Sequence, residues 1–117
     1  MSTKRNKIEF GDFQTPLPLA LEVLGAVGDI NGYDAIIEPT CGYGTFLQAC
    51  LERGVSLEKL EGWEINPDYV KFANNSICSN NRGVVKEQDF FKVNWCLLEK
   101  ELSGKSVLFL GNPPWVT

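Results

Sequence analysis

Short apolar runs alternate along the chain with stretches in which apolar residues recur every three or four positions, and this alternation predicts an α/β fold. Runs of the first kind are typical of parallel strands buried on both faces, and stretches of the second kind are typical of amphipathic helices. The predicted strands are Asp34–Glu38, Leu60–Ile65, Gly83–Gln88 and Ser106–Leu110.

The predicted helices lie between these strands and begin at recognisable signals. Thr15 and Asn66 each precede a proline, which predicts a capping side chain followed by proline at the first helical position. The expected helices are about Pro16–Gly28, Thr45–Arg53, Pro67 to about Cys78, and a short helical cover that contains Trp95, Leu97, Leu98 and Leu102.

The turn after the first strand is the stretch that indicates a ligand. Gly42 and Gly44 let the backbone turn sharply without a Cβ, which predicts a floor for a small molecule. Glu38 stands at the end of the strand, where it would repel a phosphate and attract a cation. A positively charged ligand that carries adenosine therefore fits better than a dinucleotide.

Two further acidic residues follow the ends of predicted strands. Glu64 comes 20 residues after Gly44, the spacing at which an acid accepts hydrogen bonds from ribose hydroxyls in nucleotide-binding sheets. The alternative for Glu64 is a solvated carboxylate at a strand end. Asp89 could accept from an exocyclic amine and Phe90 could cover an adenine face, although Phe90 or Phe91 could equally belong to the core.

Length and composition bound the fold to one modest domain. A chain of 117 residues with 44% hydrophobic content can form a single core. We expect residues 1–11 to be a flexible segment, either a frayed terminus or an arm that contacts phosphates, and residues 12–117 to form the domain. No apolar run approaches a membrane span, and the Lys-Arg start lacks the apolar run of a signal peptide, which predicts a cytoplasmic protein.

Cysteine and histidine usage removes several classes of chemistry. The cysteines are isolated, without a CxxC pair, and the chain has no histidine, so we expect reduced thiols and no metal site. Serine and cysteine hydrolases that need an imidazole base are excluded, and Cys41 in the glycine turn has no such base to activate it. The four residues concerned are Cys41, Cys50, Cys78 and Cys96.

The net charge is −4, and the only basic cluster consists of Lys4, Arg5 and Lys7. Proteins that bind nucleic acid on their own normally present a basic face. If DNA is the substrate, most of the contacts that hold it lie elsewhere.

The last predicted strand runs into Gly111-Asn112-Pro113-Pro114-Trp115. Two consecutive prolines end the strand and restrict the backbone, so the Asn112 amide and the Pro113 carbonyl have a settled direction. Such rigidity suits a site more than a linker.

Taken together, these motifs resemble the S-adenosylmethionine-dependent DNA amino-methyltransferases. The sequence Asn-Pro-Pro-Trp follows Glu-Pro-Thr-Cys-Gly-Tyr-Gly and Gly-Trp-Glu-Ile-Asn-Pro in the order of the adenine-N6 enzymes of restriction-modification systems. The resemblance runs from Phe13 to Trp115. It implies a Rossmann-like methyltransferase sheet of which this chain supplies only the first four strands and nothing that reads DNA.

The resemblance also implies a role for each matching residue toward the cofactor. The Thr-Pro segment would meet the methionine carboxylate, the acid of the first strand would face the ammonium group, and the following turn would lie beneath. The acid of the second strand would take the ribose hydroxyls, and the residues after the second and third strands would hold the adenine. These residues are Thr15, Pro16, Glu38, Pro39, Thr40, Cys41, Gly42, Gly44, Glu64, Ile65, Asp89 and Phe90.

For catalysis, the resemblance implies that the Asn112 side chain and the Pro113 carbonyl hold the exocyclic amine of an adenine flipped out of double-stranded DNA. The nitrogen lone pair would then point at the sulfonium methyl. Pro114 completes the motif, and Trp115 would stack on the flipped base. The alternative for Trp115 is a core aromatic at a strand end.

The sequence also predicts a partner and leaves alternatives to the function that the resemblance implies. The strand Ser106–Leu110 would form an apolar edge, which predicts pairing with a protein partner or a second copy. Two alternatives to a DNA methyltransferase remain. One is a non-catalytic interaction fragment, and the other is a methyltransferase that acts on protein glutamine or RNA. A nicotinamide dehydrogenase fits least, because it leaves the Asn-Pro-Pro-Trp motif unexplained.

Overall fold

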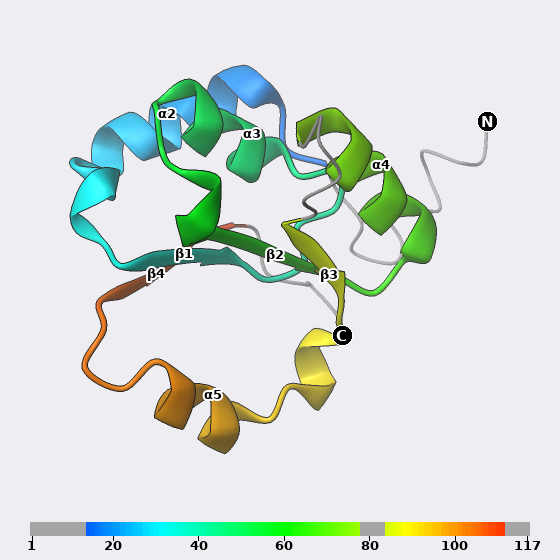
Figure 1. Ribbon diagram of the computed structural model, residues 1–117. Helices are drawn as coiled ribbons and strands as arrows, with labels where there is room; N and C mark the ends of the chain where they lie inside the picture. The colour runs from blue at the N-terminus through cyan, green and yellow to red at the C-terminus, as the bar shows by residue number, and fades with distance from the viewer. Residues whose placement is uncertain (1–13, 78–83, 112–117) are drawn as a thin grey trace.

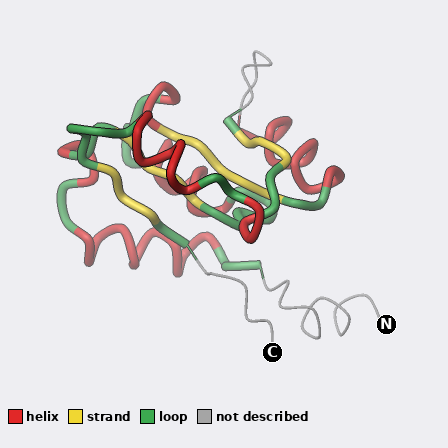
Figure 2. The backbone as a smooth tube through the Cα atoms, turned by 90° about the horizontal axis from the view of Figure 1, so that it is seen from below, coloured by secondary structure: helices red, strands yellow, loops and turns green. Residues whose placement is uncertain are grey.

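The computed structural model describes residues 14–77 and 84–111, and its centre is a four-stranded sheet in the order β3-β2-β1-β4. All three strand pairs are parallel. The strands run side by side as one layer (Figure 2). Their bounds are β1 Ala35–Glu38, β2 Leu60–Glu64, β3 Val85–Glu87 and β4 Val107–Phe109. The predicted α/β fold with a parallel sheet is confirmed.

Helices cover both faces of this sheet, but unequally. Helices α2, α3 and α4 lie on one face, and α5 lies alone on the other (Figure 1). The helices span α2 Leu17–Val27, α3 Thr45–Glu52, α4 Pro67–Ile77 and α5 Trp95–Glu101, and short 3₁₀ turns span η1 Ile30–Gly32, η2 Leu57–Lys59 and η3 Phe90–Lys92.

The core lies between β1 and the layer of α2 and α3. Its largest fully buried side chains are Leu24 on α2, Ile36 on β1, and Leu47 and Cys50 on α3. Ile36 pairs with Leu60 on one side and with Leu108 on the other, so β1 is a central strand and its apolar run is buried on both faces.

Of the two predicted capping residues, Asn66 is confirmed and Thr15 is not. Asn66 caps α4 as expected, because its Oδ1 accepts hydrogen bonds from the backbone N–H groups of Asp68 (2.9 Å) and Tyr69 (3.4 Å). The predicted capping role of Thr15 is wrong. Helix α2 starts one residue later than expected, with Pro16 itself in the cap position in extended conformation and without a side-chain hydrogen bond.

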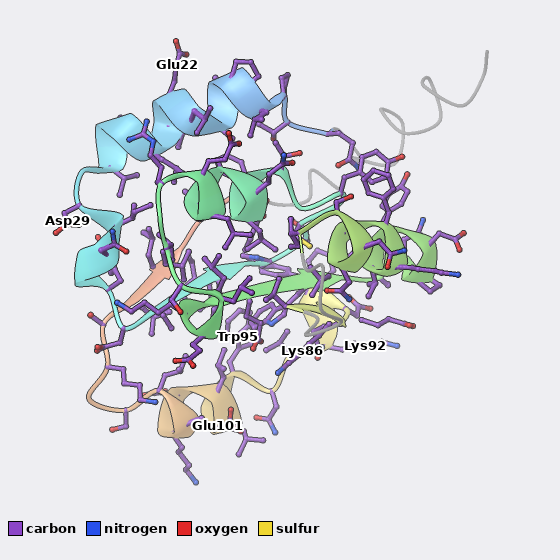
Figure 3. All side chains as sticks on the ribbon, turned by 45° about the horizontal axis from the view of Figure 1, so that its top comes forward. Glu22, Asp29, Lys86, Lys92, Trp95 and Glu101 are labelled. Atoms are coloured by element: carbon purple, nitrogen blue, oxygen red, sulfur yellow. The ribbon has the colours of Figure 1, made fainter. Side chains whose placement is uncertain are left out.

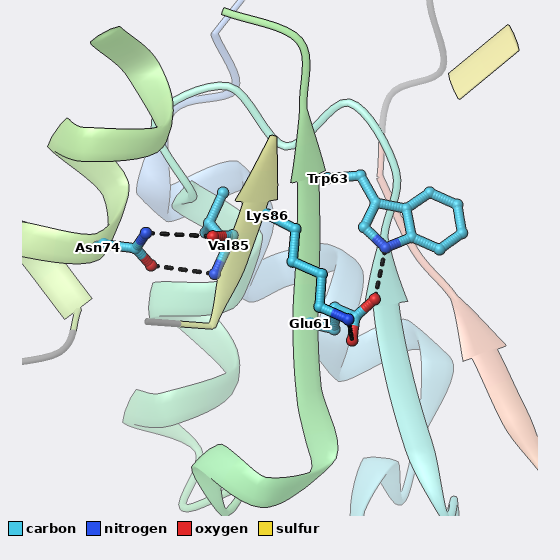
Figure 4. Close-up of polar contacts among 5 residues, drawn as sticks. All are labelled: Glu61, Trp63, Asn74, Val85 and Lys86. Carbon is cyan, nitrogen blue, oxygen red and sulfur yellow. Dashed lines mark hydrogen bonds and ion pairs between the residues drawn. The ribbon is translucent and has the colours of Figure 1, made fainter. Parts of the chain in front are cut away.

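The outer edge of β3 is closed by a side chain. Asn74 on α4 donates to the Val85 carbonyl (3.1 Å) and accepts from the Val85 N–H (3.0 Å), as a neighbouring strand would (Figure 4). In the described part of the chain no strand lies beyond β4. The two borders of the sheet therefore differ.

Gly62 on β2 is a position where the core leaves no room for a side chain. A Cβ there would lie 2.7 Å from Leu47 Cδ1 and 2.9 Å from Cys41 Sγ. We expect Gly62→Ala to lower the free energy of unfolding by about 1–3 kcal/mol because of overpacking, measured by urea denaturation.

Gly25→Ala is the matched control for this substitution. Gly25 lies exposed within α2, and its nearest neighbour to a new Cβ would be Arg53 Nη2 at 3.6 Å. This change should raise stability by about 0.5–1 kcal/mol. Equal effects at both positions would contradict the packing argument.

Candidate functional site

The carboxyl ends of three strands face one hollow of about 470 Å³. Pro39 follows β1, Phe90 follows β3, and Gly111 follows β4 at the point where the predicted catalytic motif begins. The lining is completed by Trp95, Phe109 and Leu110. The carboxyl ends of these three strands thus lie around one hollow, at the edge where parallel sheets place ligands.

Glu64, at the end of β2, joins this strand to the glycine turn after β1. Its Oε1 accepts a hydrogen bond from the Gly42 N–H (2.8 Å), and its Oε2 accepts one from the Asn66 N–H (2.9 Å). The side chain is buried, with 8% exposure, so the alternative of a solvated carboxylate is wrong. Each carboxylate oxygen has a second lone pair, which leaves acceptor capacity for a ligand.

Glu38, at the end of β1, is a buried acid with unused bonding capacity. It is 4% exposed, and its Oε1 has no hydrogen-bond partner among the described residues. Burial raises the pKa of the Glu38 carboxyl well above its ordinary value, a hydrogen bond from the backbone of Leu47 lowers it, and the charge of Glu64 raises it further. A cation bound beside Glu38 would favour the ionised carboxylate and would pair with its full negative charge.

Glu38 also touches the end of β4. A Cβ built on Gly111 would lie 3.0 Å from Glu38 Cγ, so the backbone before the predicted catalytic motif passes directly over this carboxyl. The acids of β1 and β2 and the end of β4 therefore belong to one site.

The two turn glycines serve the protein's own packing. Both have positive φ, 58° at Gly42 and 84° at Gly44. A Cβ at Gly44 would lie 3.2 Å from Ala73 Cβ on α4, and a Cβ at Gly42 would overlap the Gln14 carboxamide. The expectation that these glycines leave space for a ligand thus needs correction, since protein atoms fill the space that each one leaves open. Thr40, at φ 57°, shares the tight turn.

The described cysteines are free thiols, as predicted. Burial, with an added contribution from Glu38, raises the pKa of Cys41 far above its ordinary value, and burial raises the pKa of Cys50 to about 11. Both thiols are therefore neutral at physiological pH, and neither is an activated nucleophile. Cys41 packs against Gly62 and donates its backbone N–H to the Trp63 carbonyl (2.7 Å).

After β3, Asp89 caps the turn η3, and Phe90 lines the hollow. Asp89 Oδ1 accepts a hydrogen bond from the Phe91 N–H (2.9 Å) and caps η3. This turn directs Phe90 into the hollow, whereas Phe91 is 70% exposed and does not belong to the core.

An aromatic cluster lies at the hollow, and the sequence interpretation assigned no chemistry to its members other than Phe90. Trp95 projects from α5 toward the sheet (Figure 3), where its ring centroid lies 5.9 Å from that of Trp63 and 5.8 Å from that of Phe90. Phe109 on β4 lies 6.2 Å from Trp95. The available signal was Trp95 itself, a tryptophan at the start of a helix five residues after Phe90.

Glu61 orients one member of this cluster. The Trp63 Nε1–H donates to Glu61 Oε2 (2.6 Å), and Lys86 Nζ lies 3.1 Å from Glu61 Oε1 (Figure 4). Trp63 is thereby held as one wall of the aromatic cluster.

The remaining predicted residues are not among those that line the hollow, or they lie outside the described part. Thr15 and Pro16 precede α2, and Ile65 after β2 is 61% exposed. The predicted catalytic residues Asn112, Pro113, Pro114 and Trp115 lie outside the described residues.

Neither metal ligation nor membrane insertion is indicated by what the structure describes. Residues 14–77 and 84–111 contain no group of side chains arranged to hold a metal ion. Among the same residues, no helix has the length and apolar character needed to cross a bilayer.

Comparison with known proteins identifies relatives along nearly the whole chain. The sequence is 38% identical over 119 positions to the Type II methyltransferase M.NspV of Nostoc sp., covering 99% of this chain and 25% of the relative. It is 31% identical to modification methylase CviBIII of Paramecium bursaria Chlorella virus NC1A, covering 97% of this chain and 28% of that protein. No protein-family model matches.

A third relative, the Type II methyltransferase M.CvrRI of Paramecium bursaria Chlorella virus XZ-6E, is 30% identical over 98% of this chain and 27% of its own length. The chain therefore spans about a quarter of the length of these relatives. The predicted resemblance to restriction-modification methyltransferases is confirmed over nearly all of this sequence.

Proposed function

Because this chain is homologous to a quarter of the length of restriction-modification methyltransferases, we propose that it forms the cofactor-binding and catalytic-motif part of a DNA adenine-N6 methyltransferase. The proposed reaction moves a methyl group from S-adenosylmethionine to the exocyclic amine of an adenine flipped out of double-stranded DNA. The observation that carries the proposal is the unpartnered, buried Oε1 of Glu38 beside an apolar hollow.

The residues at the strand ends suit this cofactor by charge and by shape. Glu38 would hold the ammonium group, and the remaining lone pairs of Glu64 would accept from the ribose hydroxyls. The hollow between Pro39 and Phe90 would take the adenine, and its volume lies within the usual range for ligand pockets. When bound, S-adenosylmethionine supplies an electrophilic methyl group on a sulfonium.

The proposed roles of the motif after β4 rest on the resemblance to the family. Gly111, the residue before Asn112 in sequence, lines the hollow. The Asn112 side chain and the Pro113 carbonyl would accept the two N–H bonds of the adenine amine, while Trp115 would stack on the base. Stacking of this kind contributes about 1–3 kcal/mol per base.

Isothermal titration calorimetry tests the cofactor assignment. We expect a micromolar Kd for S-adenosylmethionine and at least about hundredfold weaker binding of NAD, a difference of about 2.8 kcal/mol. NAD is the matched control because it shares the adenosine and replaces the cationic amino acid with phosphates, which Glu38 would repel.

An absence of heat at millimolar S-adenosylmethionine would contradict the proposal and favour a non-catalytic fragment. Tighter binding of NAD would also contradict it. Methyl transfer to adenine-containing duplex DNA, compared with an RNA and a glutamine-containing peptide, distinguishes the substrate classes; transfer to either of the latter would overturn the DNA assignment.

The exposed border at β4 supports the proposal of a partner. Leu108 is half-buried and Phe109 is 45% exposed, and in the described part of the chain no strand covers this edge. We expect association at tens of micromolar in sedimentation velocity, and expect Phe109→Lys to shift the protein toward the monomer. The control is Leu97→Lys, an equally exposed apolar position on α5. A wild-type monomer at this concentration would contradict the prediction.

A further inference from the structure

Gln14 lies where the segment before α2 meets the glycine turn after β1. Its Oε1 accepts a hydrogen bond from the Tyr43 N–H (3.0 Å). Its carboxamide also occupies the space that a side chain at position 42 would need, since a Cβ on Gly42 would lie 2.9 Å from both Gln14 Cδ and Gln14 Nε2. Gln14 is therefore packed against the turn and hydrogen-bonded to it.

This contact completes a pair of side-chain acceptors for consecutive backbone amides. Glu64, from the end of β2, accepts from the Gly42 N–H (2.8 Å), and Gln14 accepts from the Tyr43 N–H. The two acceptors come from elements on opposite sides of the turn in sequence, 22 residues after it and 29 residues before it. The turn is thus fixed from two directions by groups outside it.

Gln14 is also the residue immediately before Thr15 and Pro16. Pro16 is tied to α2, since its carbonyl accepts a hydrogen bond from the Ala20 N–H (3.1 Å). The contact of Gln14 with the turn adds a second link, which joins the segment before α2 to the turn after β1.

We propose that Gln14 is a positioning residue that holds the Thr15–Pro16 segment against the glycine turn and so closes the site around the amino-acid end of the cofactor. This inference rests on the proposed function for the identity of the ligand. Gln14 is half-buried and does not belong to the hydrophobic core, so we expect the fold to tolerate its substitution.

The expected effect is selective for one end of the ligand. Gln14→Ala removes the acceptor for the Tyr43 N–H and should raise the Kd for S-adenosylmethionine about tenfold, as expected for the loss of one partly buried hydrogen bond. The Kd for adenosine, which lacks the amino-acid end, should stay unchanged. Gln14→Glu keeps an acceptor oxygen and should restore most of the affinity.

The matched control is Gln48→Ala, the same substitution at an exposed position on α3, which should leave both affinities unchanged. Equal loss of S-adenosylmethionine and adenosine affinity in Gln14→Ala, or no loss of either, would overturn the proposal.

A double-mutant cycle in urea denaturation tests the contact without any ligand. Gly42→Ala should lower the unfolding midpoint less in the Gln14→Ala background than in the wild type, because the overlap with the carboxamide is gone. Additive effects of the two substitutions on the unfolding midpoint would show that the two positions do not interact, and would contradict the proposal. If the wild type binds neither ligand while the double-mutant cycle shows coupling, the proposed function is wrong. The contact between Gln14 and the turn is then still supported.

Discussion

Replacing Glu38 by glutamine should strongly weaken the binding of S-adenosylmethionine while leaving the folded protein at least as stable at neutral pH. The substitution keeps the shape of a side chain that is 4% exposed and removes its capacity for negative charge. Loss of one partner from a buried charge pair costs about 2–5 kcal/mol, which corresponds to a Kd at least about thirtyfold higher.

The stability effect follows from the direction of the pKa shift. Burial raises the pKa of folded Glu38 well above 4.5, so between this value and the folded pKa the native state holds a proton that the unfolded chain has released. The contribution of Glu38 to stability is therefore fully present below about pH 4.5 and is lost as pH rises through the folded pKa. Glutamine has no proton to lose, so the variant should lack this decline in urea denaturation as pH rises above 4.5.

The same carboxyl should couple ligand binding to proton release. A cationic ammonium group beside Glu38 favours the ionised carboxylate, so wild-type protein should release a proton on binding at a pH between 4.5 and the raised pKa of folded Glu38. Calorimetry in buffers of different ionisation enthalpy measures this proton, and Glu87→Gln, at an exposed acid on β3, is the control that should retain it. Undiminished binding by Glu38→Gln would contradict the role of Glu38.

Glu64→Ala is expected to impair both folding and ligand binding. The substitution leaves the N–H groups of Gly42 and Asn66 without their acceptor, and a buried unsatisfied group costs about 1–3 kcal/mol. We therefore expect a loss of about 2–5 kcal/mol in the free energy of unfolding, together with the loss of S-adenosylmethionine binding, measured by urea denaturation and calorimetry.

Glu87→Ala is the matched control, because Glu87 pairs in register with Glu64 on the neighbouring strand and is exposed. This variant should retain both properties. Glu64→Gln keeps one acceptor oxygen and should fall between the wild type and Glu64→Ala. A Glu64→Ala protein as stable as the wild type would show that the turn does not depend on these two hydrogen bonds.

Most elements of this fold were predictable because their signals are local. The apolar run before Glu38 and the asparagine-proline pair at position 66 act on their own neighbours in sequence, and strand and helix bounds accordingly agree within a few residues. The misplaced cap at Thr15 is a one-residue error, since proline fits both before and within the first helical turn.

What the sequence did not reveal depends on contacts between distant residues. The ring centroids of Trp63 on β2 and Phe109 on β4 lie 6.3 Å apart because both strands are neighbours of β1 in the sheet, which the sequence does not show. The position of Gln14 on the turn likewise depends on how α2 is placed against α3. By contrast, the acids at the strand ends were predictable, because the carboxyl ends of parallel strands meet at one edge whatever packs around them.

The side-chain amide of Asn74 gives the sheet a direction of growth. By occupying the N–H and carbonyl of Val85, it blocks β3 from recruiting another strand at this residue, whereas β4 carries no comparable cap within the described chain. If two copies paired through β4, Asn74 would block further strand addition at Val85 on both outer edges, so the combined sheet would be closed and not open-ended.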